Sequence, residues 1–203
     1  MVFKDKVMSS TYLRFLSRNK LYTFIEVFGL SVALGFVILL ASYARTEFSV
    51  GAKQPLSRQL YVIGAGNSFG MTLGTSEEFF PSVPEIKAWT RISYGGTADV
   101  MVGDDYYQAA EISVDTNFFK FFDYRLTGCP KDNVLENEDE VILSESFAKK
   151  VFGNEDPIGR TLSVDKSKWT VVGVVEDFGP VDVFNHCDMF TSIKRAQRRF
   201  AWM

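Results

Sequence analysis

The side chains that could do chemistry in this chain are few and scattered. His186 is the single histidine, so a histidine metal cluster is unavailable, and a Ser–His–Asp triad would depend on this one residue. Two pairs of adjacent carboxylates occur, at residues 77–78 and 104–105, but neighbours in sequence point apart, and the spacing of a calcium loop is missing. We therefore expect no catalytic residue, no cofactor-binding residue, no metal ligand and no enzyme.

Nucleotide and nucleic-acid chemistry are also disfavoured. Residues 64–66 contain two glycines but lack the Gly-Lys-Ser/Thr ending and the directly following helix of a phosphate loop, so we expect no ATP hydrolysis by that route. The net charge of −3 leaves no basic excess to neutralise phosphates. Cys129 and Cys187 form no Cys-X-X-Cys or zinc pattern. Outside the cytoplasm they could form a disulfide, but two separate free thiols are the favoured interpretation.

A basic stretch lies near the end of the sequence. It consists of Lys194, Arg195, Arg198 and Arg199. A solvated strand-to-loop segment is one interpretation, and a surface for an anionic partner or lipid is the other.

The element that organises the chain is an apolar run at residues 21–44. It is 24 residues long, and Glu26 is its one charged residue. As a helix it extends about 36 Å, enough to cross a hydrocarbon core of about 30 Å, and a helix satisfies its own backbone in lipid. A signal peptide cleaved after Ser42-Tyr43-Ala44 is the rival interpretation. We expect a retained transmembrane helix, because the run exceeds a signal core and 20 residues precede it.

The charges that flank this helix predict its orientation. Basic residues are concentrated before it, against Asp5 alone, and are more thinly spread after it. They are Lys4, Lys6, Arg14, Arg18 and Lys20 before the helix, and Arg45, Lys53 and Arg58 after it. The positive-inside rule places residues 1–20 in the cytoplasm and residues 45–203 outside.

The cytoplasmic flank at residues 1–20 has an amphipathic pattern. Its apolar face would consist of Met8, Tyr12, Phe15 and Leu16. The neighbouring basic residues could then bind anionic membrane lipid, although a short basic flank that merely fixes topology is the alternative.

Small residues four apart in the membrane helix could admit a second helix. The pairs are Gly29 with Ala33 and Ser31 with Gly35. A lone helix in which these residues face lipid remains the alternative. Glu26 could contact a partner helix or reach the headgroup layer.

Short strands and helices alternate from residue 45 onwards. Strands are expected at 59–63, 91–93, 98–102, 106–114, 140–143, 161–164 and 169–176, and helices at 82–89, 118–122 and 145–152. Ser144 and Gly153 are the expected cap and stop of the last helix, and Asp115 is the expected cap of the middle one. Residues 171–175 are apolar on both faces, which predicts a central, covered strand.

Four phenylalanines lie within five positions, at 118, 119, 121 and 122. They cannot all face one side of a short helix. We expect at least two to be fully buried in one core with Phe147 and the valines of residues 171–175. The alternative is an exposed cluster that docks a partner.

Three segments in this order carry a resemblance to a known family. They are residues 114–124 (VDTNFFKFFDY), 141–160 (VILSESFAKKVFGNEDPIGR) and 171–178 (VVGVVEDF). Together, behind the apolar helix with its GLSVALG motif at 29–35, they resemble the periplasmic core domain of MacB/FtsX-type ABC transporter permeases. The resemblance runs from about residue 13 to about residue 190.

This resemblance implies an α+β fold, with one N-terminal transmembrane helix and a mixed α/β extracytoplasmic domain of two subdomains. It also implies a location in the bacterial inner membrane, a cytoplasmic ABC ATPase subunit as partner, a second permease copy in a dimer, and an extracytoplasmic partner or substrate. The function it implies is to couple the ATPase to export, extraction or partner control outside. An anchored binding or sensor module without transport is the alternative.

The chain departs from the family plan in two ways. Family members have four membrane helices, whereas no second apolar run occurs before Met203. A truncated product, a split subunit or a fragment would each fit this pattern. Residues 53–56 also lack the acidic residue that usually follows the first membrane helix in this family.

Overall fold

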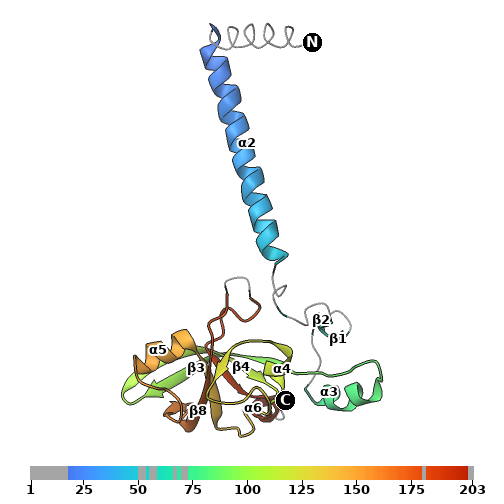
Figure 1. Ribbon diagram of the computed structural model, residues 1–203, viewed down its shortest axis with the longest axis vertical. Helices are drawn as coiled ribbons and strands as arrows, with labels where there is room; N and C mark the ends of the chain where they lie inside the picture. Colours follow the sequence, from blue (N-terminus) through green and yellow to red (C-terminus); the bar gives the residue numbers. More distant parts are fainter. Residues whose placement is uncertain are drawn as a thin grey trace. The chain divides into compact units, whose positions relative to one another are not determined.

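The computed structural model describes residues 18–49, 54, 59–65, 68–69, 73–179 and 182–200. The chain divides into two compact units, Met1–Ser49 and Val50–Met203 (Figure 1). The two subdomains that the family resemblance implies within the second unit stay a prediction. The expected amphipathic helix in residues 1–20 lies almost entirely outside the described residues.

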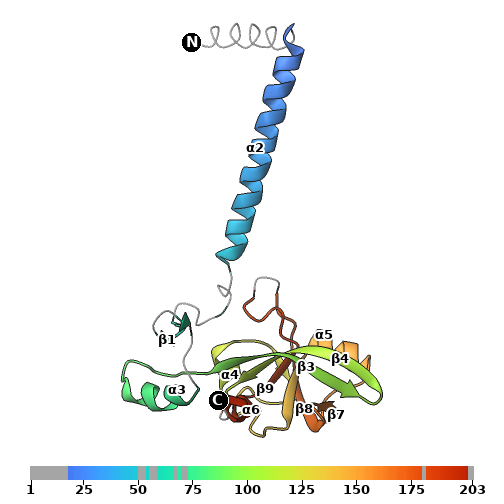
Figure 2. The same cartoon turned by 180° about the vertical axis from the view of Figure 1, so that it is seen from behind.

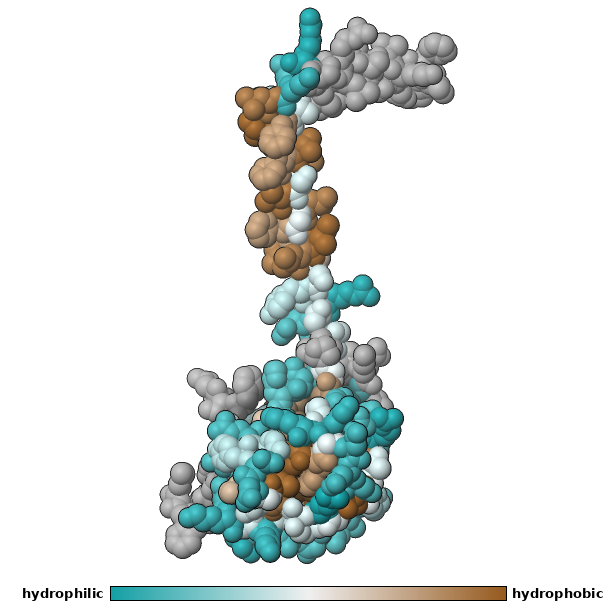
Figure 3. Space-filling view, turned by 90° about the vertical axis from the view of Figure 1, so that its left-hand side faces the viewer, coloured by the Kyte–Doolittle hydropathy of each residue, from teal (hydrophilic) through white to brown (hydrophobic). Residues whose placement is uncertain are grey.

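Helix α2, Lys20–Glu47, confirms the expected helix of membrane length and extends it at both ends. None of its side chains is buried, and its sequence contains no proline. Figure 3 shows apolar side chains along its middle and polar ones at its two ends. Arg45 lies in the last turn, where a cation is favoured by the helix dipole. Among the described residues, α2 is the one helix long and apolar enough to span a membrane.

The second unit combines a large sheet with short helices and a separate small hairpin. The large sheet consists of β3 (Ile92–Val102), β4 (Asp105–Val114), β5 (Leu126–Thr127), β6 (Glu140–Ser144), β7 (Thr161–Val164), β8 (Ser167–Val175) and β9 (Met189–Ser192). The helices are α3 (Leu73–Phe79), the 3₁₀ turn η1 (Phe80–Ser82), α4 (Phe118–Phe121), α5 (Glu145–Phe152) and α6 (Ile193–Phe200). Strands β1 (Gly64–Ala65) and β2 (Ser68–Phe69) form the hairpin. This mixture confirms the expected fold class.

The large sheet closes on itself. Its strand order is β5-β8-β6-β9-β4-β3-β7, and β7 also pairs with β8. Six strands, β3, β4, β9, β6, β8 and β7, therefore form a ring (Figure 2). Within it the β4–β9 and β6–β8 pairs are parallel, and the other pairs are antiparallel. Closure removes free edges from the ring strands and encloses a core.

Strand β3 is longer than the sequence predicts. Two strands were expected, at 91–93 and 98–102, but they form one strand that continues through Gly95 and Gly96. The register against β4 shifts between Tyr94 and Gly96, which marks a bulge, and Gly96 has a φ of 81°. A glycine accepts this conformation without steric cost, so the two glycines bend the strand rather than end it.

The first core lies inside the ring. Its buried members on the strands are Ala98, Val100, Ala109, Val141, Leu143, Leu162, Val164, Trp169, Val171 and Met189. All six ring strands contribute to this set. Phe147 and Phe152 of α5 belong to the same cluster, so α5 buries its apolar face against this core.

The second core contains the phenylalanine cluster. Phe118 and Phe119 are fully buried, which confirms the expectation that at least two would be. They pack on Phe190 of β9, with ring centroids 5.8 and 5.5 Å away, and Val175 lies in the same core. The expectation that Phe147 would share this core is wrong. Neighbouring strand residues point to opposite faces, so the sheet separates the two clusters.

Strand β8 is covered on both faces, as its sequence predicts. Val171 and Val174 pack in the first core, whereas Val172 and Val175 pack in the second. The expected hairpin of β7 and β8 is confirmed by their antiparallel register.

Local capping signals predict α5 correctly. The Ser144 hydroxyl accepts a hydrogen bond from the Phe147 N–H at 3.2 Å, and Gly153 follows the helix with a φ of 65°. Asp177, after β8, accepts a further bond from the Ser146 N–H at 2.8 Å. Two side chains thus satisfy free N–H groups in the first turn.

Two elements near the start of the domain differ from expectation. Residues 59–63 form no strand, and the helix expected at 82–89 lies earlier, in α3 and η1. Ser82 does not cap a helix start; its hydroxyl donates to the Phe79 carbonyl at 2.6 Å. Val83 is extended, with φ −108° and ψ 102°, because a residue before proline avoids the helical region. The proline at 84 therefore follows the helix instead of opening one.

We predict that Phe118→Ala or Phe119→Ala in the full chain, solubilised in detergent, lowers the free energy of unfolding of the domain by about 3–5 kcal/mol. Each ring is fully buried, so its removal leaves a cavity. Phe121→Ala serves as the control, because its ring is only half-buried. Denaturant unfolding of the three variants measures this, and equal losses at all three positions would contradict the prediction.

The half-buried thiol of Cys187 gives a prediction about pH. Burial, with smaller contributions from Asp188 and Asp182, raises the pKa of Cys187 to about 11. At pH 8 about 0.1% of it is then thiolate, against about a quarter of an exposed thiol with a pKa of about 8.5. In a Cys129→Ser variant, iodoacetamide at pH 8 should react with Cys187 about two hundredfold more slowly than with an exposed thiol of ordinary pKa. The rate should climb until about pH 11, and a plateau near pH 9 would refute the assignment.

Candidate functional site

The histidine, cysteine and paired carboxylate side chains that the sequence offers for chemistry do not come together in one site. His186 lies exposed in a turn, and Asp104 lies in the turn that joins β3 to β4. Among the described residues, no group of three or more His, Cys, Asp or Glu side chains could hold a metal ion. Cys129 and Cys187 are both free thiols. Among the described residues, the features that we consider for function are the long apolar helix α2, a groove and the ionic contacts beside this groove.

Three hydroxyl groups of α2 donate hydrogen bonds to backbone carbonyls one turn earlier. The Ser31 hydroxyl donates to the Val27 carbonyl at 2.6 Å, and Thr23 and Thr46 make similar bonds to the carbonyl four residues earlier. Such bonds remove the cost of placing a hydroxyl in an apolar environment. A Cβ placed on Gly29 or on Gly35 would meet nothing within 4 Å, so both positions present open backbone on the helix surface.

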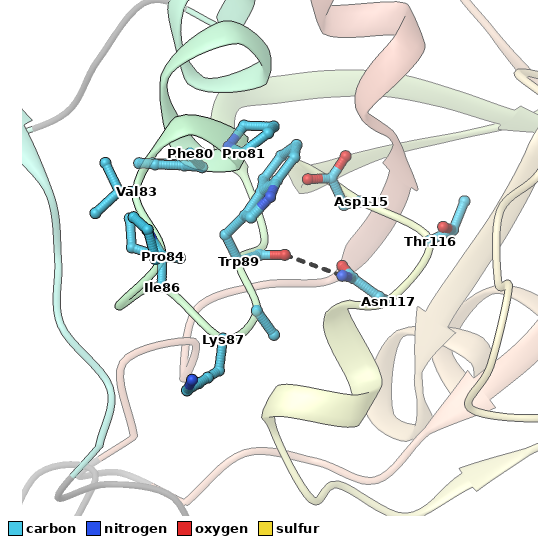
Figure 4. Close-up of a pocket in the computed structure, with 11 residues that line it drawn as sticks. Phe80, Pro81, Val83, Pro84, Ile86, Lys87, Trp89, Asp115, Thr116 and Asn117 are labelled. Atoms are coloured by element: carbon cyan, nitrogen blue, oxygen red, sulfur yellow. Dashed lines mark hydrogen bonds between the residues drawn. The ribbon is translucent and has the colours of Figure 1, made fainter.

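A groove of about 550 Å³ opens where the segment after α3 meets the loop after β4 (Figure 4). One wall is mainly apolar and is formed by Phe80, Pro81, Val83, Pro84, Ile86, Lys87, Ala88 and Trp89. The other wall is polar and is formed by Asp115, Thr116 and Asn117. In Figure 4 the Trp89 indole stands between the two walls.

Contacts on both walls position Trp89. Its ring packs against Phe80, with the centroids 5.3 Å apart, and the Arg91 guanidinium lies 5.4 Å from its ring centroid. Its carbonyl accepts a hydrogen bond from the Asn117 side-chain amide at 2.9 Å. The groove thus offers an aromatic surface next to hydrogen-bonding groups, but its lining includes no nucleophile paired with a base.

Arg91 and Asp115 form the strongest ionic contact beside the groove. The Asp115 carboxylate accepts from the Arg91 backbone N–H at 2.7 Å and from the guanidinium Nη2 at 2.7 Å, and Nε lies 3.0 Å from Oδ2. Both side chains are nearly buried, with 12% and 13% of their surface exposed. The expectation that Asp115 caps α4 is wrong. Its position is set by the sheet, because the Ile92–Val114 pair of β3 and β4 brings the next residues face to face.

Glu77 connects this pair to the last helix. Its carboxylate accepts hydrogen bonds from Arg91 Nη1 and, at 3.1 Å, from the Gln197 amide of α6. These two bonds, with the Arg91 charge, lower the pKa of Glu77. The carboxylate is therefore ionised at neutral pH and joins α3, β3 and α6.

The basic stretch forms helix α6, so the expected strand-to-loop structure is wrong. Lys194 donates to the Glu136 carbonyl at 2.7 Å, and Arg198 pairs with Glu138 at 2.8 Å. Arg195 pairs with Asp165 at 2.9 Å and lies 4.2 Å from the Trp169 ring centroid. These three cations therefore bind groups within the domain; the fourth side chain, at 199, lies outside the described set.

A polar cluster lies buried where α6 meets the ring. The Thr191 hydroxyl donates to the Glu111 carboxylate at 2.9 Å and contacts the Ser113 hydroxyl at 2.9 Å. Arg195 Nε lies 3.8 Å from Glu111. Gly95 permits this arrangement, since a Cβ there would lie 3.1 Å from the Glu111 side chain. The cluster is fixed by its own hydrogen bonds, which fits a structural role.

A family model described as the MacB-like periplasmic core domain matches residues 23–203 of the chain. The chain belongs to this family. The match begins inside α2 and continues to residue 203, so a helix long and apolar enough to cross a membrane and a MacB-like periplasmic core domain occur in one chain. The domain is therefore of the kind that ABC transporter permeases of the MacB type carry.

Individual relatives of this MacB-like chain match over shorter spans. The macrolide export ATP-binding/permease protein MacB of Aggregatibacter actinomycetemcomitans is 40% identical over 47 residues, which are 23% of this chain and 7% of that protein. A solved permease domain from Porphyromonas gingivalis is 25% identical, with a TM-score of 0.49, and the match covers 64% of this chain and 56% of that one. The periplasmic region of MacB from Actinobacillus actinomycetemcomitans is 22% identical, with a TM-score of 0.43, over 55% and 50%. The chain spans about half of each solved domain.

The sequence does not predict the groove, and the one role that it predicts for a lining residue, Asp115 as a helix cap, is wrong. Trp89 and Arg91 were placed in separate elements, and Asn117 had no assigned role. One signal could have indicated their contact: if 91–93 and 106–114 are taken as neighbouring antiparallel strands, Arg91 and Asp115 lie at the same end of the pair. No local pattern predicts that α3 would pack beside them.

Proposed function

We propose that this chain is the anchor and extracytoplasmic domain of an ABC transporter permease. It couples a partner cytoplasmic ATPase to work outside the membrane: export of a substrate, its extraction, or control of a partner protein. The observation that supports this most directly is the single family match that runs from within α2 to residue 203. The printed name of the MacB relative, a macrolide export ATP-binding/permease protein, supports the same class of activity.

In this role the partner subunit hydrolyses ATP, and the chain transmits the resulting motion. Its sequence contains no phosphate-binding loop, and the groove lining contains no nucleophile paired with a base. The small residues of α2 provide a surface on which other membrane helices, including those of a second permease copy, can pack closely. Anionic lipid binds the basic flank at residues 1–20.

We propose that α2 is oriented with the N-terminus of the chain in the cytoplasm and the domain outside. The basic excess before α2 supports it. Alkaline phosphatase fused after residue 203 should be active in intact cells, because it folds only outside the cytoplasm, and the same enzyme fused before residue 1 should be inactive. The reverse pattern would refute the orientation.

The coupling role is tested with the full chain and a MacB-type ABC ATPase from the same organism, reconstituted together in lipid nanodiscs. Purified alone, the chain should hydrolyse no ATP above a blank. Added to the ATPase, it should form a stable complex and change the rate of ATP hydrolysis. Turnover by the chain alone would contradict the proposal, and failure to bind the ATPase or to change its rate would instead favour an anchored binding or sensor module.

A further inference from the structure

Residues 73–89, here called the flap, lie outside the closed sheet. They comprise α3, η1 and the extended segment that ends at Trp89, and none of these described residues pairs with a strand of the ring. Figures 1 and 2, which view the domain from opposite sides, both show α3 standing to one side of the sheet. Its attachment to the ring therefore depends on side chains rather than on backbone pairing.

Glu77 provides the attachment at the α3 end of the flap. Its carboxylate binds Arg91, the residue just before β3, and Gln197 on α6. Arg91 is itself fixed by several bonds to Asp115, so Glu77 contacts a guanidinium that is already immobilised. The Glu77 side chain is half exposed to solvent, so the contact can break without a buried charge being left on the flap.

The junction between flap and ring also contains polar atoms that destabilise the contact between them. Two buried side-chain oxygens, Thr90 Oγ1 and Asn117 Oδ1, have no hydrogen-bond partner among the described residues. Thr90 directly follows the flap, and Asn117 holds the Trp89 carbonyl across the groove. A buried polar atom without a partner destabilises the arrangement that buries it. Separation of the two walls would admit water to these oxygens and relieve that cost.

We propose that the flap moves as a unit about Thr90 between a closed and an open position, and that Glu77 is the latch that holds it closed. The groove is then the joint between flap and ring, and it widens when the latch breaks. Helix α6 takes part directly, because Gln197 binds the same carboxylate as Arg91. A displacement of α6 therefore weakens the latch, so the position of α6 and the opening of the groove are coupled.

Hydrogen exchange on the full chain in detergent tests the latch. Glu77→Gln keeps the size of the side chain but removes its charge, and Gln197→Glu places a like charge beside Glu77. Both should accelerate exchange in peptides from residues 73–89 by about fivefold to tenfold, the range expected for loss of charged hydrogen bonds at a partly exposed site. Exchange in β8 should stay unchanged. Glu78→Gln, at the exposed neighbour of Glu77, is the matched control and should have no effect.

A thiol probe gives an independent measurement. Ser76 lies on α3 and is 4% exposed, so Ser76→Cys, in a chain with Cys129→Ser and Cys187→Ser, should react slowly with N-ethylmaleimide. Adding Glu77→Gln should accelerate the reaction by about the same factor as it accelerates exchange in the flap. Faster hydrogen exchange confined to the flap, together with a faster thiol reaction at position 76, supports the latch. No increase in either measurement, or an equal increase in β8, would overturn it.

Discussion

The pairing of β7 with two strands is the contact on which the rest of the domain depends. Along its length β7 pairs with β8 in a hairpin, and at Ser163 and Val164 it also pairs with β3. Without that second pairing the six strands would form an open sheet with two free edges. With it they enclose an interior that side chains such as Trp169 and Met189 must fill. Closure thus decides where the first core lies.

Closure also explains why a second, separate core exists. The outer face of the parallel β6–β8 pair still carries apolar residues, and parallel strands are usually covered on both faces. The phenylalanines of α4 supply that cover, with Phe190 of β9 at the centre of the contact. The alternation of β6 sends Leu143 into one core and Ile142 into the other. A single short strand therefore connects the packing of both layers.

Features that depend on residues close together in the chain can be predicted from the sequence alone. The length of α2 follows from an uninterrupted apolar run, and the limits of α5 follow from Ser144 and Gly153. The β7–β8 hairpin and the double-sided burial of residues 171–175 follow from strand periodicity. The ordered motifs also indicated the family, which the match over residues 23–203 confirms. In each case the deciding interaction spans a few residues, so a local pattern suffices.

Contacts between segments far apart in the chain become visible only in the folded domain. Asp115 has the sequence context of a helix cap, but Arg91, 24 residues earlier, binds its carboxylate because β3 and β4 end side by side. The contact of Glu77 with Gln197 spans 120 residues. Such contacts leave no periodic trace, since each partner is a common polar residue whose neighbours in sequence say nothing of the other. The groove depends wholly on contacts of this kind, and for that reason the fold class was predictable while the site was not.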